Sequence, residues 1–262
     1  MKTPPLLLSV VLPIRNEEEI LWDACNLFAQ HFDRSVGKEN WQYVLMENGS
    51  SDKTPGIIKE IVQKWPQSIS ASFAKGDRGQ ALREGILSAQ GIWSLIMDVD
   101  HLWDSPYFEW AWRHREEYDF IIASKRADST LNKQGLNRRM LSAGLSAILN
   151  CMFDCVVAET RGMKFIHTEK VRPIAKLCQM RRGIFETEMT LRALRGRLWI
   201  AELPVPYIYY RRPRNLMIKK IEQNVRDLFR LYRVMKNVPY EGHIKYRRFC
   251  REDLISETTS KS

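Results

Sequence analysis

Two aspartates, Asp98 and Asp100, form the sharpest chemical signal in the sequence. They follow an apolar run, Trp93 to Met97, that is typical of a buried strand. Carboxylate oxygens are the ligands that hard divalent cations prefer, and the second carboxylate of such a pair is able to accept from a ribose hydroxyl. A bound Mg²⁺ or Mn²⁺ stabilises negative charge that builds on a leaving diphosphate. We therefore expect a metal site here, with a solvated pair of loop carboxylates as the alternative.

Polar clusters also follow the other apolar runs of the first hundred residues. They are Arg15–Glu17 after Leu6–Ile14, Glu47–Gly49 after Tyr43–Met46, and Lys75–Gly79 after Ile69–Phe73. Helical patterns at 16–32, 54–65 and 79–89 separate these runs. Strands that alternate with helices pair in parallel, and ligands bind at the carboxyl ends of parallel strands. The four loops are therefore predicted to converge on one site.

The second half of the sequence has a less regular pattern. It predicts strands at 118–124, 164–168 and 198–210, and helices at 134–154 and 183–194. Pro204 and Pro206 interrupt the last strand, which favours an edge position. After Asn215 an amphipathic helix is predicted to about residue 236, with basic residues beside one apolar stripe made of Ile218, Ile221, Val225, Leu228, Phe229 and Tyr232.

The net charge of +10 is located at the C-terminal end. The segment from Tyr209 to Arg251 carries thirteen basic and three acidic residues, which accounts for the whole excess. A basic surface of this kind attracts nucleic acid, an anionic membrane or a phosphate-bearing substrate. Composition alone leaves these three partners open.

Composition predicts a soluble globular protein with one main core, because 44% of the 262 residues are hydrophobic and 27% are charged. No apolar stretch approaches the length of a membrane-spanning helix, and Leu6–Ile14 is not followed by a cleavage site typical of a signal peptide. Five scattered cysteines suit reduced thiols. We expect a cytoplasmic protein with a catalytic domain at 1–214, a basic helical segment at 215–252 and a flexible tail at 253–262.

Four segments in order resemble the family-2 glycosyltransferases of the GT-A fold. They are Ser9–Glu19 (SVVLPIRNEEE), Val44–Thr54 (VLMENGSSDKT), Gly76–Gly91 (GDRGQALREGILSAQG) and Leu95–Asp100 (LIMDVD). Later motifs resemble the dolichyl- or polyprenyl-phosphate sugar synthase branch, among them Ala123–Arg126, Gly162–Lys164 and Phe185–Glu188. The resemblance implies a Rossmann-like α/β fold, with a mixed, mainly parallel sheet flanked by helices and the basic amphipathic helix at the C-terminus. It also implies an inverting, metal-dependent transfer from a UDP- or GDP-sugar.

The resemblance also implies roles for individual residues. The nucleotide-sugar site would comprise Pro13, Arg15, Glu17, Glu47, Asp77, Arg78, Gly79, Asp98 and Asp100. Asp98 and Asp100 would bind ribose and the metal, Mg²⁺ or Mn²⁺. Glu47 stands where the family commonly has Asp, and Leu102 stands where the branch often has a Gln that assists the metal, so His101 or Asp104 is a substitute ligand.

The chemistry on the acceptor side depends on the acidity of the acceptor. A hydroxyl needs a general base, for which Glu186 is the candidate, with Glu188 behind it. A lipid phosphate is already anionic and needs cations that gather and orient it. The basic residues available are Arg126, Arg138, Arg139, Arg211, Arg212 and Lys219, each of which has solvated surface charge as its alternative interpretation.

Three functional hypotheses follow. The first is transfer to a polyprenyl- or dolichyl-phosphate acceptor by a protein that is peripheral at the cytoplasmic membrane face. The second keeps the donor chemistry but uses a soluble or glycan hydroxyl as acceptor, because Ala158 stands where the branch tends to have Asp. The third is nucleic-acid binding, which the basic segment allows but which no recognised binding module supports.

Overall fold

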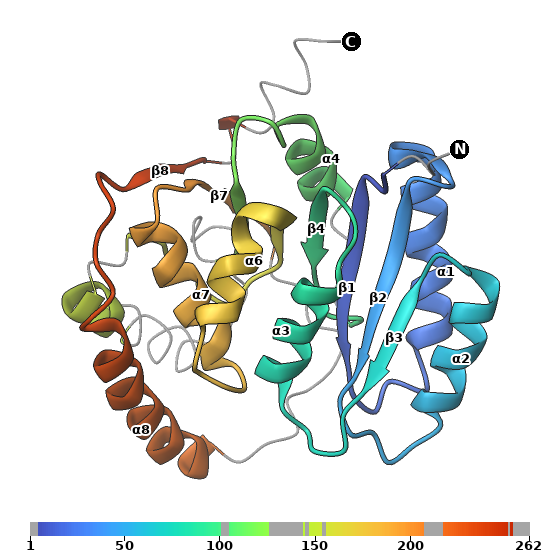
Figure 1. Ribbon diagram of the computed structural model, residues 1–262, viewed down its shortest axis with the longest axis horizontal. Helices are drawn as coiled ribbons and strands as arrows, with labels where there is room; N and C mark the ends of the chain where they lie inside the picture. Colours follow the sequence, from blue (N-terminus) through green and yellow to red (C-terminus); the bar gives the residue numbers. More distant parts are fainter. Residues whose placement is uncertain are drawn as a thin grey trace. The chain divides into compact units, whose positions relative to one another are not determined.

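The protein is described from a computed structural model of residues 1–262, in which residues 5–100, 105–125, 144, 147–153, 156–206, 217–250 and 252–253 are described. The chain forms two compact units (Figure 1). Unit 1 comprises Met1–Trp103, Met163–Leu177 and Arg181–Gly183, and unit 2 comprises the rest.

Unit 1 contains a mixed, mainly parallel sheet. Its strands are β1 (Leu8–Ile14), β2 (Trp41–Glu47), β3 (Ile69–Ser72), β4 (Trp93–Ile96) and β6 (Lys164–His167). They lie in the order β3-β2-β1-β4-β6, and β6 alone among them runs antiparallel to its neighbour. Every residue of β1 and β2 is buried, as expected for parallel strands that are covered on both faces.

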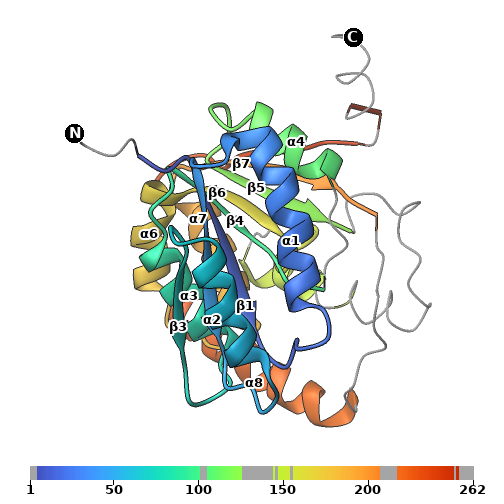
Figure 2. The same ribbon diagram turned by 90° about the vertical axis from the view of Figure 1, so that its right-hand side faces the viewer.

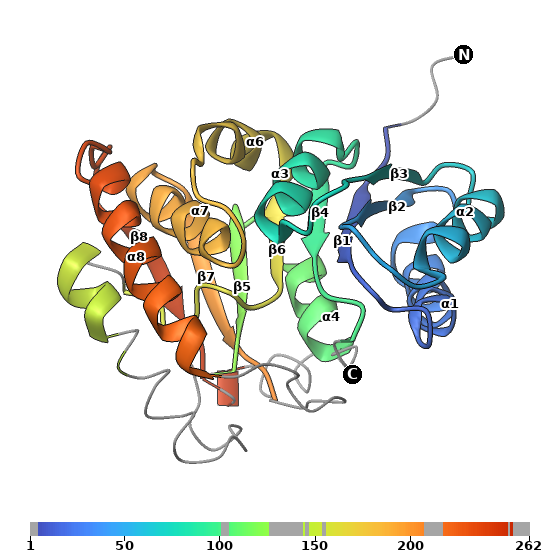
Figure 3. The same cartoon turned by 90° about the horizontal axis from the view of Figure 1, so that it is seen from below.

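Helices cover both faces of this sheet. They are α1 (Leu21–Phe32), which continues into the π-helical turn η1 (Asp33–Gly37), α2 (Thr54–Lys64), α3 (Arg78–Ser88) and α6 (Thr168–Leu177). Strand β1 stands between α1 and α3 in Figure 2, and Figure 3 shows α3 and α6 together on one face. The right-handed crossover rule explains this placement, because the chain moves outward from β1 to β3 and then returns past β1 to reach β4.

Unit 2 contains three parallel strands in the order β5 (Phe120–Ser124), β7 (Trp199–Pro204) and β8 (Lys245–Arg248). Its helices are α4 (Ser105–Arg113), α7 (Ile184–Arg195) and α8 (Met217–Met235), and residues 147–153 are also helical. Helices α7 and α8 lie side by side (Figures 1 and 3). Arg195 closes the C-terminal end of α8 by donating to the carbonyls of Met235 and Val238, at 2.6 and 3.0 Å.

The structure corrects two expectations for unit 2. The strand at 198–210 was expected at an edge, but β7 pairs with β5 on one side and with β8 on the other. Pro204 is tolerated because it is the last residue of β7 and Pro206 lies beyond it. The apolar stripe of α8 is also different, because Leu231 and Met235 are fully buried while Phe229 is 64% exposed.

Most of the predicted helices and strands of unit 1 are present, with boundaries that differ by a few residues. The helix expected at 16–32 begins at Leu21, because residues 15–20 form a loop. Helices α4 and α6 and strand β8 were not predicted. The helix expected at 134–154 lies mostly outside the described residues. The tail predicted at 253–262 also lies outside them, apart from its first residue. Within the described ranges, no helix is both long and apolar enough to cross a bilayer.

Candidate active site

The loops that follow β1 and β2 are locked together by hydrogen bonds. Asn16 has a positive φ of 55°, its backbone N–H donates to the Ser50 hydroxyl at 3.1 Å, and its side-chain oxygen accepts from the Ser51 N–H at 2.8 Å. The backbone N–H of Glu17 donates to the Thr54 hydroxyl at 2.9 Å. The polar residues after these two strands therefore form one rigid corner.

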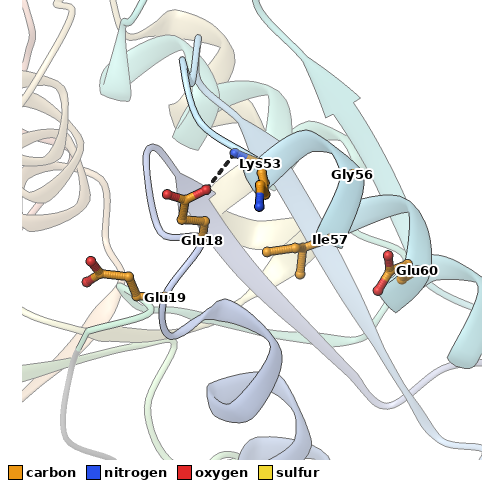
Figure 4. Close-up of a pocket in the computed structure, with 6 residues that line it drawn as sticks. All are labelled: Glu18, Glu19, Lys53, Gly56, Ile57 and Glu60. Carbon is orange, nitrogen blue, oxygen red and sulfur yellow. Dashed lines mark hydrogen bonds between the residues drawn. The ribbon is translucent and has the colours of Figure 1, made fainter.

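A surface pocket of about 570 Å³ borders this corner (Figure 4). One wall is formed where the Glu18 carboxylate accepts from the Lys53 N–H at 3.0 Å. The remaining lining residues are Glu19, Gly56, Ile57 and Glu60. None of the residues predicted to bind the nucleotide sugar lines this pocket, and three of its lining residues are glutamates. The predicted nucleotide-sugar residues therefore lie elsewhere.

Glu47, at the end of β2, is buried and holds its own loop. Its carboxylate accepts from the Ser50 N–H at 2.5 Å and from the Ser72 hydroxyl at the end of β3. Burial disfavours the charged form, but these hydrogen bonds outweigh it, so the pKa of the Glu47 carboxyl lies below its ordinary value. Both carboxylate oxygens are thus already occupied. Whether Glu47 also accepts from a nucleobase stays a prediction.

Asp77 links the start of α3 to the segment Arg181–Gly183. It is the N-cap of α3, because its Oδ1 accepts from the Gln80 N–H at 3.1 Å, and the same oxygen accepts from the Arg182 N–H at 2.9 Å. The Asp77 N–H in turn donates to the side-chain oxygen of Asn48 at 2.6 Å. A Cβ at Gly79 would lie 2.6 Å from the Arg182 nitrogen, so only glycine fits that close approach.

The predicted residue Arg15 also reaches the loop after β3. A side chain at Gly76 would collide with the Arg15 guanidinium, and one at Gly49 would lie 3.1 Å from the Gly76 nitrogen. Gly49 has a φ of 69°, a conformation that favours glycine. Pro13, the remaining predicted residue of this corner, is buried within β1.

Arg78 and Asp98 form an ion pair that joins α3 to the end of β4. Both side chains are 31% exposed, and Asp100 is also partly exposed. The carboxylates of Asp98 and Asp100 are suitable ligands for Mg²⁺ or Mn²⁺. Among the described residues no group of three or more possible metal ligands occurs, and the substitute ligands His101 and Asp104 lie outside them. The metal-binding role of Asp98 and Asp100 stays a prediction.

Lys164 is a charged residue near this pair to which sequence analysis assigned no role at the site. It is the first residue of β6, lies in register with Ile96, and is fully buried. Asp98 follows Ile96 by two residues. The lysine is therefore placed next to the strand end that carries the aspartates. In the sequence, Lys164 belongs to the motif Gly162–Lys164 and begins the strand predicted at 164–168.

In unit 2, the segment Val156–Gly162 lies at the carboxyl ends of β5 and β7. Lys125, just after β5, approaches the Glu159 carboxylate to 3.8 Å. A side chain at Gly162 would collide with the Ala123 carbonyl oxygen. The Thr160 hydroxyl lies 3.0 Å from that of Thr187 on α7. We call this segment the 156–162 loop.

The two glutamates expected on the acceptor side are both on α7 and both buried. The Glu188 carboxylate accepts from the N–H groups of Gln179 and Met180 at 2.8 and 2.7 Å, and from Arg192 at 2.8 Å. These contacts give Glu188 a structural task. Glu186 is in the first turn of the helix. The predicted phosphate-binding residues lie outside the described residues or side chains, namely Arg126, Arg138, Arg139, Arg211, Arg212 and Lys219.

The model of glycosyl transferase family 2 matches residues 9–187. This chain therefore belongs to glycosyl transferase family 2, as its four ordered motifs predicted. The match includes the strands of unit 1, apart from the first residue of β1, and the strand-end loops described above.

Two curated relatives are dolichyl-phosphate beta-glucosyltransferases. The one from Dictyostelium discoideum is 26% identical over 214 residues, and one from Trichomonas vaginalis is 23% identical over 210 residues. Each alignment includes 76% of this chain, and the chain spans only 65% of the length of either relative.

A solved structure confirms the predicted GT-A fold. It is the glucosyl-3-phosphoglycerate synthase of Mycobacterium tuberculosis in complex with Mn²⁺, UDP-glucose and phosphoglyceric acid. The two chains superpose with a TM-score of 0.55 at 17% identity, over 87% of this chain and 80% of that one. At this level of identity the similarity defines the fold only.

Proposed function

We propose that this protein is an inverting, metal-dependent glycosyltransferase that moves a sugar from a UDP- or GDP-sugar to a polyprenyl- or dolichyl-phosphate acceptor at the cytoplasmic membrane face. The observation that carries the proposal is the contact between the strand-end loops of unit 1, in a chain of this family. The two dolichyl-phosphate glucosyltransferases support the acceptor class.

On the donor side, Asp98 and Asp100 would hold Mg²⁺ or Mn²⁺, which would supply positive charge next to the departing diphosphate. Arg78 balances the charge of Asp98 and would also supply hydrogen-bond donors to a diphosphate oxygen. Arg15, Asp77 and Gly79 border the same space. The locked loops hold these groups in place before the donor binds, so little ordering is needed on binding.

The reaction is a single displacement. An oxygen of the acceptor phosphate forms a bond to the anomeric carbon as the bond from that carbon to the diphosphate breaks, and the nucleoside diphosphate leaves. Because the acceptor is already anionic, no general base is required, and basic side chains supply binding and orientation. The Arg and Lys residues predicted for this task remain candidates.

Helix α8 supports a peripheral association with the membrane. Phe229 is 64% exposed and Tyr232 is 43% exposed, and exposed arginines at 226, 230 and 233 accompany them. Aromatic side chains with flanking basic residues are typical of helices that lie on anionic lipid. The wild type is expected to cosediment with anionic vesicles and not with zwitterionic vesicles. Phe229→Ser is expected to weaken the binding to anionic vesicles. Equal binding of the wild type and Phe229→Ser to anionic vesicles would contradict this expectation.

The transfer itself is tested with UDP-glucose or GDP-mannose as donor, phytanyl phosphate as acceptor, and Mn²⁺ or Mg²⁺. Asp100→Asn is expected to reduce transfer roughly 100-fold, as loss of metal-site support does in other enzymes. The exposed Asp23 on α1 provides the matched control, Asp23→Asn, which retains activity. Transfer that survives both Asp100→Asn and a chelator would exclude the metal role.

A hydroxyl acceptor is the second candidate function, with Glu186 as general base. It is favoured by Ala158, which stands where the branch tends to have Asp. In this case Glu186→Gln abolishes transfer to a hydroxyl acceptor and leaves donor binding intact. Under the phosphate proposal the same variant continues to glycosylate phytanyl phosphate. Assays of Glu186→Gln with each acceptor therefore distinguish the two candidates.

A further inference from the structure

A fully buried carboxylate, that of Glu202, lies inside unit 2 on strand β7. Its oxygen atoms accept from the backbone N–H of Ala158 at 2.9 and 3.1 Å, and from that of Glu159 at 3.0 Å. A buried negative charge is costly unless several donors surround it. Glu202 therefore fixes the position of two successive peptide groups at the start of the 156–162 loop.

The other side of the carboxylate faces β8, near the C-terminus of the chain. The Tyr246 hydroxyl donates to Glu202 Oε2, and Arg248 Nε donates to the same oxygen at 3.0 Å. Arg248 also donates through Nη2 to the Val156 carbonyl at 2.8 Å. Strand β8 thus contacts the loop both directly and through Glu202.

Charge complementarity supports this arrangement. Burial and the neighbouring Glu202 carboxylate both raise the pKa of the Tyr246 hydroxyl, so the hydroxyl stays a donor. Burial lowers the pKa of the Arg248 guanidinium, but the Glu202 charge outweighs it and leaves that pKa raised. Both side chains therefore keep the protonated form that Glu202 requires.

The loop held in this way is well placed to meet a ligand. It lies at the carboxyl ends of the parallel strands β5 and β7, where α/β sheets bind ligands. It carries Glu159, which is near Lys125, and ends at Gly162, where the close approach to Ala123 leaves no room for a side chain. A shift of Ala158 and Glu159 would therefore move the groups that line this edge.

We propose that Glu202, together with Tyr246 and Arg248, positions the 156–162 loop for the acceptor, so that the C-terminal strand β8 forms part of the acceptor side. The proposal rests on the proposed function above. Glu202 itself is a positioning residue, since its oxygen atoms are occupied by the loop and by β8.

The first test measures the loop without any substrate. Hydrogen–deuterium exchange of the peptide that contains Ala158 and Glu159 is compared in the wild type, Tyr246→Phe and Arg248→Met. Loss of one hydrogen bond is expected to speed exchange there roughly five- to tenfold. Lys245→Met is the matched control, because Lys245 is on the same strand and its ammonium lies over Trp199 instead. Unchanged exchange in both variants would overturn the proposal.

The second test uses steady-state kinetics with UDP-glucose or GDP-mannose and phytanyl phosphate. Tyr246→Phe and Arg248→Met are expected to raise the acceptor KM roughly five- to tenfold and to leave the donor KM unchanged, because the donor loops belong to unit 1. Faster exchange with an unchanged acceptor KM would show that the loop has no acceptor role and would overturn the proposal.

Failure of the proposed function gives a different result. In that case the wild type does not glycosylate phytanyl phosphate at all, while the exchange experiment still reports whether Glu202 and β8 hold the loop. Glu202→Gln is a third variant, which keeps the shape of the side chain but removes its charge. Tyr246→Phe keeps the proposal falsifiable if Glu202→Gln fails to fold.

Discussion

Replacement of Glu188 by alanine distinguishes a structural glutamate from a catalytic one. Its carboxylate receives three hydrogen bonds, from the backbone of Gln179 and Met180 and from the side chain of Arg192. Glu188→Ala removes all three at once and leaves a space where a fully buried side chain had been. Glu188→Gln, the matched variant, keeps the shape and one acceptor oxygen.

The loss of stability in Glu188→Ala depends on whether each former hydrogen-bond donor finds another partner. The N–H of the exposed Gln179 can turn to water, whereas that of the buried Met180 cannot, and an unsatisfied buried donor costs about 1–3 kcal/mol. Arg192, whose side chain is only 11% exposed, loses its ion-pair partner, and breaking a buried pair costs about 3–5 kcal/mol. Since these costs overlap, we expect Glu188→Ala to reduce the free energy of unfolding by about 3–5 kcal/mol. Glu188→Gln is expected to cost about 1–3 kcal/mol.

Urea unfolding followed by circular dichroism measures both variants against the wild type. Exchange at the Met180 amide reports the local effect, and it is expected to rise most in Glu188→Ala. If Glu188→Ala unfolded at the wild-type urea concentration and yet lost transferase activity, the structural reasoning would be refuted. Glu188 would then be a catalytic residue.

Other predictions concern single side chains. Because the pKa of Glu47 is lowered in the folded state, its ionised form stabilises the fold above the ordinary pKa of 4.5. This contribution is lost as the pH falls through the lower pKa of the folded state. The stability difference between the wild type and Glu47→Gln should therefore shrink in acid unfolding curves below pH 4.5. Gly162→Ala is expected to cost about 1–3 kcal/mol or more in urea unfolding because of its collision with backbone. Gly56→Ala, inside α2 with open space around it, should instead gain about 0.5–1 kcal/mol. Burial raises the pKa of the Cys25 thiol to about 12, so native protein at pH 8 should be alkylated at the exposed Cys250 before Cys25, as mass spectrometry can show.

The arrangement of the strand-end loops of unit 1 could be predicted from the sequence because βα alternation fixes where loops meet. Once 93–97 and the runs before it are strands with helices between them, parallel pairing places Asp77 and Asp98 at the same edge. The detailed contacts could not be predicted in this way. Nothing in the sequence indicates that Glu47 accepts from Ser72, because that contact depends on the register between two strands.

The elements of unit 2 were less predictable for physical reasons. Strand β8 has the sequence Lys-Tyr-Arg-Arg, which lacks the alternating apolar residues that indicate a strand, since most of its side chains are exposed. Without knowledge of β8, Pro204 and Pro206 suggested an edge position for β7. On α8 apolar residues occupy more than one face, so the pattern could not decide between Phe229 and Leu231 as the buried position.

The place of β4 in the sheet has a consequence for synthesis of the chain. Strand β4 pairs with β1, which precedes it, and with β6, which begins 68 residues after β4 ends at Ile96. At about 5–20 residues per second, a ribosome needs roughly 3–14 s to make that stretch. During this time the nascent chain exposes one edge of an apolar strand, which is able to pair with other chains. Translation products that stop before Lys164 are therefore expected to be the aggregating ones.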